Sequence, residues 1–233
     1  MKVMMDPLPV VSPPRAVLFD WDNTLVDTWP CILKAMNMTL VHMEHDAWTR
    51  EEGMTRISRS LRESFPGLFG KRWREAESVF YESFRSCHLD MLTPLPHAEA
   101  LVRHICGMGV WVGIVSNKTG DLLRIEVEHL GWGGLFHQVA GAGDAKADKP
   151  NIEHILHALQ GSGLKPGQDI WFVGDHAIDM QCARESGCTP FLLHHHGPLV
   201  GDLLSWAPQG IYGSCGEFLD ALRTLAVPSN ENR

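Results

Sequence analysis

Two aspartates one residue apart form the stretch of this chain that is best suited to chemistry. Asp20 and Asp22 follow the apolar run 16–19, which is too short for a helix and contains neither Gly nor Pro. Such a run is typical of a buried strand in a parallel sheet, and ligands collect where such strands end. Two carboxylates so close together need a cation or a proton nearby. The pair therefore indicates a polar site at a strand end, although a capped turn uses the same residue types.

Polar side chains also follow two later apolar runs. The run 110–115 is followed by Ser116 and Asn117, and the run 170–173 is followed, after one glycine, by Asp175. Both runs have the length and composition of buried strands. Because the carboxyl ends of parallel strands meet at one edge of a sheet, we expect these side chains to lie beside the aspartate pair.

Two charged residues occur near the starts of predicted helices. Lys149 stands directly before Pro150, where a helix over 151–159 is expected to begin. Asp179 lies four residues after Asp175, which is about one helical turn, so both carboxylates can face the same cleft. We therefore expect one site that gathers all of these side chains at one edge of the sheet.

The rest of the pattern predicts the scaffold of this site. Short apolar strands alternate with helices from residue 97 onward, which is typical of right-handed βαβ units on a parallel sheet. The predicted class is therefore α/β. The predicted strands cover 16–19, 110–115, 135–140, 170–173 and 188–193, and the predicted helices cover 97–106, 119–130, 151–159, 177–185 and 215–225.

One long segment interrupts the alternation with helical periodicity. The predicted insert consists of a helix capped by Thr28, a break at 51–55, a helix over 57–65 ended by Pro66 and Gly67, and a helix over 72–89. A proline-rich connection at 93–96 leads back to the sheet. The expected organisation is a flexible leader (1–14), an α/β core (15–27 and 96–233) and a helical insert (28–95).

Composition narrows the range of partners. The formal net charge of −8 argues against a nucleic-acid partner, whose phosphates require a basic face. No apolar run has the length of a membrane span, so no membrane partner is expected. The 6 cysteines show no zinc-ligand spacing, which favours reduced thiols in a cytoplasmic protein. We expect a monomer or a weak homodimer that acts on a small molecule.

Four short motifs occur in this chain in a fixed order. They are D-x-D-x-T at 20–24, S-N at 116–117, K-P at 149–150 and G-D-x-x-x-D at 174–179. In this order they resemble the motifs of the haloacid dehalogenase (HAD) superfamily of phosphohydrolases, over residues 15–226. The insert is similar to the small cap of the phosphoglycolate-phosphatase-like and β-phosphoglucomutase-like branch. The resemblance implies a Rossmann-like parallel sheet core with an inserted α-helical cap domain.

The resemblance also implies roles for the residues at the predicted edge. Asp20 is the expected nucleophile that forms an aspartyl phosphate. Asp22 is expected to lie among neighbouring carboxylates, to protonate the leaving oxygen and later to activate the hydrolytic water. Mg²⁺ prefers oxygen ligands and is expected on Asp20, the backbone carbonyl of Asp22 and Asp175, with Asp179 supporting them from behind. The residues expected to bind the substrate phosphate are Ser116, Asn117 and Lys149.

Two residues depart from the usual pattern of the family. His176 stands where Ser or Thr is common, and Trp21 is bulkier than the residue usually found between the two aspartates. We expect the histidine to be a neutral substitution and the tryptophan to serve packing.

Substrate choice is expected to depend on the insert, because the sheet site handles only the phosphoryl group. Arg56, in the segment 53–56, resembles the arginine of a G-x-[ST]-R turn that grips a sugar phosphate; a solvated arginine at a helix start is the alternative. The insert should also close over the strand ends as a lid.

Three functions remain open at this point. The first is a Mg²⁺-dependent phosphatase that hydrolyses a small-metabolite phosphate monoester, similar to phosphoglycolate phosphatase. The second is a phosphosugar mutase that uses the same site. The third is a protein with this fold that binds a phosphorylated ligand without turning it over. Phosphate release from a panel of phosphoesters distinguishes them.

Overall fold

The protein divides into two compact units in the computed structural model, which describes residues 13–56, 61–195 and 201–224. The core unit takes the chain up to Val26 and again from Pro94 onward, and the inserted unit spans Asp27–Thr93. The insert was predicted at 28–95. Most of the expected leader, 1–14, lies outside the described residues.

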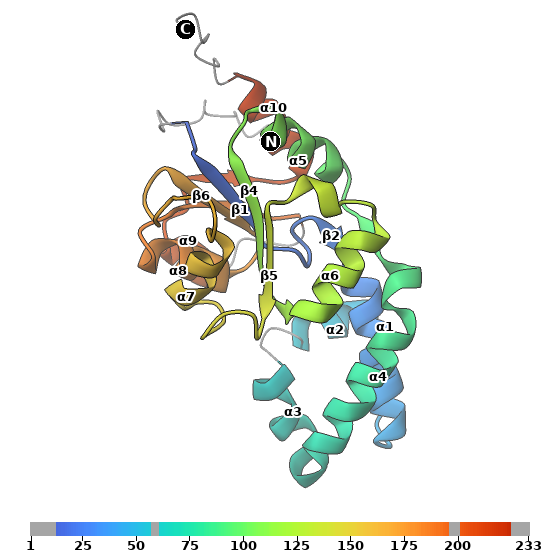
Figure 1. The fold of residues 1–233 in the computed structure, drawn as a ribbon. Coiled ribbons are helices and arrows are strands. Elements are labelled where there is room, and N and C mark those ends of the chain that lie inside the picture. The colour runs from blue at the N-terminus through green and yellow to red at the C-terminus, as the bar shows by residue number, and fades with distance from the viewer. Residues whose placement is uncertain (1–12, 57–60, 196–200, 225–233) are drawn as a thin grey trace, which may run out of the picture. The chain divides into compact units, whose positions relative to one another are not determined.

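A six-stranded parallel sheet forms the centre of the core unit (Figure 1), which confirms the predicted α/β class. Its order is β5-β4-β1-β6-β7-β8. The strands are β1 (Ala16–Phe19), β4 (Trp111–Thr119), β5 (Gln138–Ala142), β6 (Ile170–Gly174), β7 (Thr189–Leu193) and β8 (Gly210–Tyr212). In the register, Phe19 of β1 pairs with Ile114 on one side and Val173 on the other. The polar residues after these strands therefore start from neighbouring positions.

Helices cover both faces of this sheet. Figure 1 shows α7, α8 and α9 on one side and α5, α6 and α10 on the other. Their bounds are α5 (Ala98–Gly107), α6 (Gly120–His129), α7 (Ile152–Ala158), α8 (Ala177–Glu185), α9 (Gly201–Ser205) and α10 (Cys215–Thr224). Leu18 and Phe172 of the sheet form a buried cluster with Ile155 of α7 and Cys182 of α8. Burial on both faces explains why the central strands are continuously apolar.

Some strands differ from their predicted bounds. β4 continues through Ser116 and Asn117, because its pairing with β5 resumes at Thr119 after an irregularity. The strand predicted over 135–140 begins only at Gln138, after a short 3₁₀ helix, η2 (Gly133–Leu135). β8 was not predicted, since this edge strand has 3 residues and none of them is fully buried.

The inserted unit is helical. Its elements are α1 (Trp29–His42), α2 (Arg50–Arg56), α3 (Leu61–Phe69), the 3₁₀ helix η1 (Gly70–Arg72) and α4 (Trp73–Met91). Met36 and Leu40 of α1 are buried, as are Phe80 and Phe84 of α4. Phe65 of α3 packs edge-on against Phe80, with ring centroids 5.9 Å apart. The unit therefore has an aromatic core of its own.

Three local predictions for the insert were wrong. Thr28 occupies the N-cap position of α1 but makes no side-chain cap bond; the Asp27 carboxylate accepts from the Trp29 N–H instead, at 3.2 Å. The break predicted at 51–55 lies inside α2. The Thr49 hydroxyl accepts from the Glu52 N–H, and the Glu52 carboxylate accepts from the Thr49 N–H, so a T-x-x-E capping box starts this helix.

The end predicted at Pro66 and Gly67 was also wrong, because α3 continues to Phe69. The proline removes one helical hydrogen bond. The rings of Phe65 and Phe69 lie 5.1 Å apart, and both residues are buried, so apolar packing holds the turn that contains the proline. Residues 57–60, at the start of this predicted helix, lie outside the described residues.

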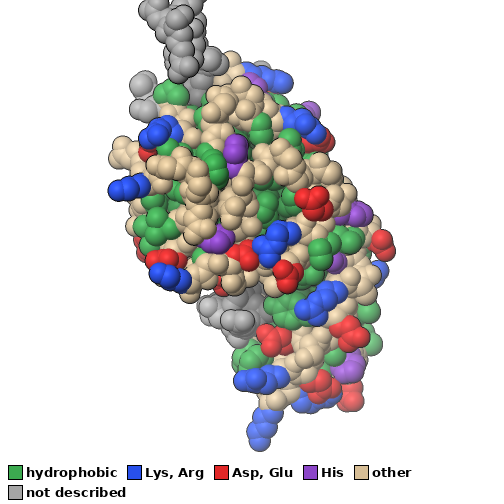
Figure 2. All heavy atoms as spheres, in the orientation of Figure 1, with side chains coloured by type: hydrophobic (Ala, Val, Ile, Leu, Met, Phe, Trp, Pro, Cys, Tyr) green, Lys and Arg blue, Asp and Glu red, His purple; other side chains and the backbone are tan. Residues whose placement is uncertain are grey.

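Two short strands mark where the chain leaves and re-enters the core. β2 (Val26–Asp27) pairs with β3 (Thr93–Pro94), so the proline-rich connection predicted at 93–96 is partly a strand. Over the described ranges, no helix combines the length and apolarity needed to cross a membrane. On the face drawn in Figure 2, acidic and basic side chains are interspersed.

Candidate active site

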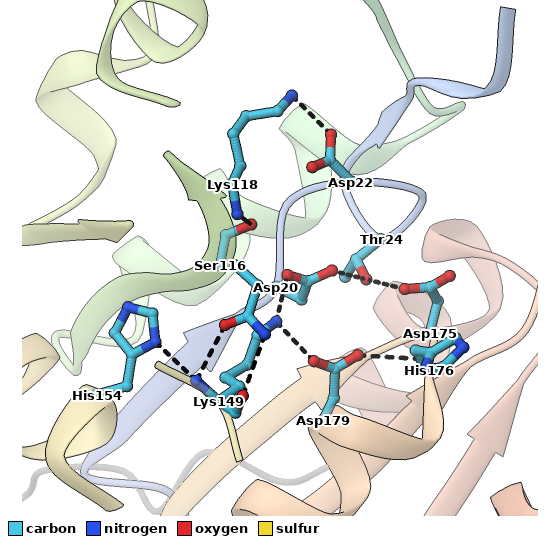
Figure 3. Close-up of polar contacts among 11 residues, drawn as sticks. Asp20, Asp22, Thr24, Ser116, Lys118, Lys149, His154, Asp175, His176 and Asp179 are labelled. Atoms are coloured by element: carbon cyan, nitrogen blue, oxygen red, sulfur yellow. Dashed lines mark hydrogen bonds and ion pairs between the residues drawn. The ribbon is translucent and has the colours of Figure 1, made fainter. Parts of the chain in front are cut away.

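Asp20 is buried directly after β1, between a lysine and a threonine (Figure 3). The Lys149 ammonium lies 2.6 Å from Asp20 Oδ1, and the Thr24 hydroxyl donates to Oδ2 at 3.4 Å. Burial raises the pKa of Asp20, and the Lys149 charge opposes that rise. The carboxylate is thus held in place by a cation that comes from a distant part of the chain.

Lys149 links two carboxylates of the site. Its ammonium also contacts Asp179 Oδ1 at 2.7 Å, and the lysine side chain is almost fully buried. Burial alone would lower the pKa of Lys149, but the charges of Asp179 and Asp20 outweigh it and raise the pKa. The lysine therefore remains a cation beside Asp20.

Asp175 and Asp179 follow β6 as the sequence analysis expected. Asp175 Oδ1 lies 3.2 Å from the same Thr24 hydroxyl, whose single proton is shared between Asp20 and Asp175. Asp179 lies in the first turn of α8, and its Oδ2 accepts from the His176 N–H at 3.0 Å. A Cβ at Gly174 would lie 2.4 Å from the Asp179 Cβ, so only glycine fits there. Both oxygens of Asp179 accept hydrogen bonds, which suits the predicted role of holding its neighbours in position without binding the metal ion.

The donor set of the site fits a divalent cation. One carboxylate oxygen from each of Asp20, Asp175 and Asp179 lies within 4.8 Å of the others. Burial, together with the charges of Asp20 and Asp179, holds the pKa of Asp175 well above its usual range. Crowded carboxylates of this kind call for a positive charge, and Mg²⁺ prefers oxygen ligands. Asp20 and Asp175 are the side chains that would hold it, and the backbone carbonyl of Asp22 stays a predicted third ligand.

Asp22 lies in a different environment from the predicted one. It was expected among carboxylates, but its Oδ1 contacts the Lys118 ammonium at 2.7 Å. The same ammonium contacts Glu126 Oε2 at 2.5 Å. Neither Lys118 nor Glu126 was predicted from the sequence to lie near Asp22. Lys118 directly follows the S-N motif, and strand alternation places it on the same side as Ser116, which is a signal that could have found it.

Asn117 makes two contacts that the sequence did not predict. Its amide Nδ2 donates to the Lys149 carbonyl at 3.1 Å, and its Oδ1 accepts from the Lys149 N–H at 2.9 Å. These two contacts hold the Lys149 backbone in place, and the predicted role of Asn117 in binding phosphate stays a prediction. Ser116 is buried, and its hydroxyl oxygen accepts from the Lys118 N–H at 3.3 Å. Its hydroxyl proton stays available in the predicted role as a phosphate donor.

A buried histidine, missed in the sequence, also supports the lysine loop. His154 Nδ1 accepts from the Lys149 N–H at 3.2 Å. Burial and the nearby Lys149 charge lower the pKa of His154, so the neutral ring that this contact requires is favoured. Lys149 is thus fixed through its backbone by Asn117 and His154, and through its ammonium by two carboxylates.

The two departures from the family pattern have structural explanations. The residue at position 176 reaches Asp179 through its backbone N–H, a contact that any side chain permits. The indole of Trp21 is fully buried, and its Nε1 donates to Glu126 Oε2 at 2.8 Å. Trp21 therefore both packs and binds a buried carboxylate.

Arg56 makes its described contacts within the inserted unit. The residue ends α2, so the predicted G-x-[ST]-R turn is the last part of a helix. Its guanidinium lies over the Trp48 ring, 5.1 Å from the centroid, and 3.5 Å from Glu52 Oε1. A role in substrate choice stays a prediction.

Comparison with known proteins agrees with this geometry. The sequence model of the family described as haloacid dehalogenase-like hydrolase matches residues 17–192. Pyrophosphatase PpaX of Bacillus velezensis is 28% identical over 172 residues, which cover 74% of this chain and 79% of that protein. Phosphoglycolate phosphatase of Salmonella typhimurium is 26% identical over 245 residues, covering 94% of this chain and 95% of that protein.

A solved structure with the same fold is the haloacid dehalogenase-like family hydrolase SP0104 from Streptococcus pneumoniae. It superimposes with a TM-score of 0.80 at 22% identity, covering 90% of this chain and 98% of that one. The family match spans more than half of the sequence and includes Asp20, Ser116 and Asp175. The chain therefore belongs to the haloacid dehalogenase-like hydrolase family.

Proposed function

We propose that this protein is a Mg²⁺-dependent phosphatase that hydrolyses the phosphate monoester of a small metabolite, as phosphoglycolate phosphatase does. The observation that carries the proposal is the buried Asp20 carboxylate, 2.6 Å from the Lys149 ammonium and beside two further carboxylates. A carboxylate nucleophile next to a cation suits attack on a phosphoryl group. Relatives named phosphoglycolate phosphatase and pyrophosphatase support the same class of reaction.

The first half of the reaction transfers the phosphoryl group to the protein. An oxygen of Asp20 attacks the phosphorus, and the bond between phosphorus and the alcohol oxygen breaks. Asp22 donates a proton to the leaving oxygen, so that a neutral alcohol departs. The products of this half are the alcohol and an aspartyl phosphate on Asp20.

The second half restores the carboxylate. Asp22, now ionised, accepts a proton from a water molecule that attacks the phosphorus. The bond between phosphorus and the Asp20 oxygen breaks, which releases inorganic phosphate. Lys149 and the Ser116 hydroxyl stabilise charge on the phosphoryl oxygens in both halves. When bound at Asp20 and Asp175, Mg²⁺ supplies further positive charge against these oxygens.

The proposal also covers the cellular compartment and the oligomeric state of the enzyme. No cysteine in the described ranges forms a disulfide, and all 6 lie in those ranges. We propose that the protein is cytoplasmic and that it acts as a monomer or a weak homodimer.

Phosphate release from a panel of phosphoesters with Mg²⁺ tests the proposed function. The panel should include 2-phosphoglycolate, several sugar phosphates, p-nitrophenyl phosphate, a phosphopeptide and an oligonucleotide. We expect release from the small monoesters at rates well above those for the two polymers. Isomerisation that depends on a bisphosphate primer would instead show a mutase. Ligand binding without turnover would show a binding protein.

Replacing Asp22 by asparagine tests the assignment of the acid and base. The variant keeps the shape of the side chain but cannot transfer the proton, so kcat should fall by roughly 10²–10⁴-fold with KM nearly unchanged. Steady-state kinetics on the best alkyl phosphate of the panel measures both values. Asp169→Asn is the matched control, because Asp169 lies in an exposed ion pair with Arg15, 3.6 Å apart. A rise in KM with kcat unchanged would contradict the assignment.

A further inference from the structure

A lysine and a glutamate that the proposed mechanism does not use lie buried behind Asp22. The Lys118 ammonium bridges Asp22 Oδ1 at 2.7 Å and Glu126 Oε2 at 2.5 Å (Figure 3 shows the first contact). The Lys118 side chain is 6% exposed and that of Glu126 is 0% exposed, whereas Asp22 is 26% exposed. The pair is thus closed to solvent on the side away from the accessible carboxylate.

Glu126 is fixed in turn by Trp21. The indole Nε1 donates to the same oxygen, Glu126 Oε2, at 2.8 Å. The Trp21 ring packs edge-on against Trp132 and Phe136, with centroids 5.8 and 6.5 Å away. A fully buried ring with two such neighbours has little freedom to move. The chain of contacts from Trp21 through Glu126 to Lys118 therefore ends on a rigid part of the core.

This chain of contacts engages one oxygen of Asp22. Oδ1 contacts the Lys118 ammonium, while Oδ2 has no hydrogen-bond partner among the described residues. An ammonium whose charge is shared with Glu126 fixes the orientation of the Asp22 carboxylate and leaves the other oxygen open. That is the arrangement needed by a group that must meet a leaving oxygen in one position.

We propose that Lys118 and Glu126 are positioning residues that hold the Asp22 carboxylate in place for proton transfer to the leaving alcohol. This inference rests on the proposed phosphatase function. A buried ion pair contributes little to stability compared with apolar side chains of the same volume. A role in orienting Asp22 explains why charges occupy this position.

The test compares two leaving groups. An alkyl alcohol must be protonated as it leaves, whereas p-nitrophenolate leaves as a stable anion without help. The ratio kcat/KM follows the steps up to release of the alcohol, so later hydrolysis of the aspartyl phosphate does not mask the comparison. The substrates are p-nitrophenyl phosphate and the alkyl phosphate that the panel shows to be turned over best.

In Lys118→Met, kcat/KM for the alkyl phosphate should fall about 10- to 100-fold, the scale of a catalytic group displaced by about 1 Å. The value for p-nitrophenyl phosphate should fall much less. Glu126→Gln keeps the size of the side chain and an acceptor for Trp21. It is therefore the variant to measure if Lys118→Met lowers the melting temperature. It should shift the same ratio in the same direction, by a smaller factor.

Two controls separate positioning from general damage. Asp22→Asn should show the same selective loss on the alkyl phosphate, and adding Lys118→Met to it should not change the ratio further, because both changes act through one group. Arg103→Met removes an exposed ion pair of the core, in which Arg103 Nε lies 2.8 Å from Glu99, and should leave the ratio unchanged.

The outcomes distinguish failure of the positioning role from failure of the proposed phosphatase function. Equal losses on both substrates in Lys118→Met and Glu126→Gln would overturn the positioning role and leave the phosphatase proposal standing. A further change of the ratio in the double variant would also overturn it. Wild-type protein that releases phosphate from neither substrate would overturn the proposed function, and the positioning role with it.

Discussion

Asp20→Asn should eliminate phosphate release, to below about 10⁻⁴ of the wild-type rate. The amide has no charged oxygen that can attack phosphorus, and the other carboxylate beside Lys149, Asp179, already accepts hydrogen bonds at both of its oxygens. The loss should appear in kcat for every substrate of the panel, because all of them use the same nucleophile. Rates of phosphate release at saturating substrate measure it.

A trapping experiment makes the same prediction independent of turnover. Wild-type protein mixed with a labelled phosphomonoester and quenched in acid should carry label, and Asp20→Asn should carry none. Asp169→Asn, at an exposed carboxylate, should label as the wild type does. Phosphate release by Asp20→Asn within tenfold of the wild type would show that another group is the nucleophile.

Unfolding is not an adequate explanation for that loss. Asp20→Asn leaves the Lys149 ammonium paired with Asp179 at 2.7 Å, so the lysine does not become an unpaired buried charge. It also removes one of the crowded carboxylates that raise the pKa of Asp175. The melting temperature of the variant should therefore stay near that of the wild type.

The sequence predicted a helix or strand correctly where a single local signal determines its structure. The run Ala16–Phe19 is a strand because it is apolar on both faces and is followed by a polar loop. The helix Ala177–Glu185 has the predicted bounds. Once these elements were placed, the parallel topology required Asp20 and Asp175 to leave the sheet at the same edge, and the structure shows that their strands are adjacent.

Contacts between distant residues could not be predicted in the same way. Lys118 and Asp22 are 96 positions apart in sequence, so their ion pair depends on how β4 and β1 pair. The Asn117 amide also contacts the backbone of Lys149, 32 positions away, and no local pattern predicts that contact. Residue type predicts what a side chain can bind, but neighbours in the fold decide what it does bind.

In the insert, tertiary packing overrode local rules. Pro66 and Gly67 are strong breaking signals, but Phe65 and Phe69 on either side are buried, so α3 continues through them. The start of α2 was different, because a usable signal was overlooked. Thr49 and Glu52 have the spacing of a capping box, and the helix begins there.

Removal of divalent cations with EDTA should abolish turnover, and added Mg²⁺ should restore it. Asp20, Asp175 and Asp179 present oxygens within 4.8 Å of one another, and Lys149 supplies one positive charge against these three carboxyl groups. An anionic substrate therefore needs a further cation at the site. Ca²⁺ is larger and takes more ligands in a looser geometry, so it should restore much less activity than Mg²⁺. Phosphate release is measured after dialysis against the chelator, first without added cation, then with Mg²⁺ and then with Ca²⁺.

Thermal unfolding provides a second readout that does not depend on catalysis. A cation that binds only the folded protein raises its melting temperature, so Mg²⁺ should stabilise the chelated wild type. Asp175→Asn removes one of the two side chains proposed to hold the ion and should reduce this shift, whereas Asp169→Asn, at the exposed ion pair with Arg15, should keep it. Full activity in the presence of chelator, together with an unchanged melting temperature on adding Mg²⁺, would show that the three carboxylates serve this site without a metal.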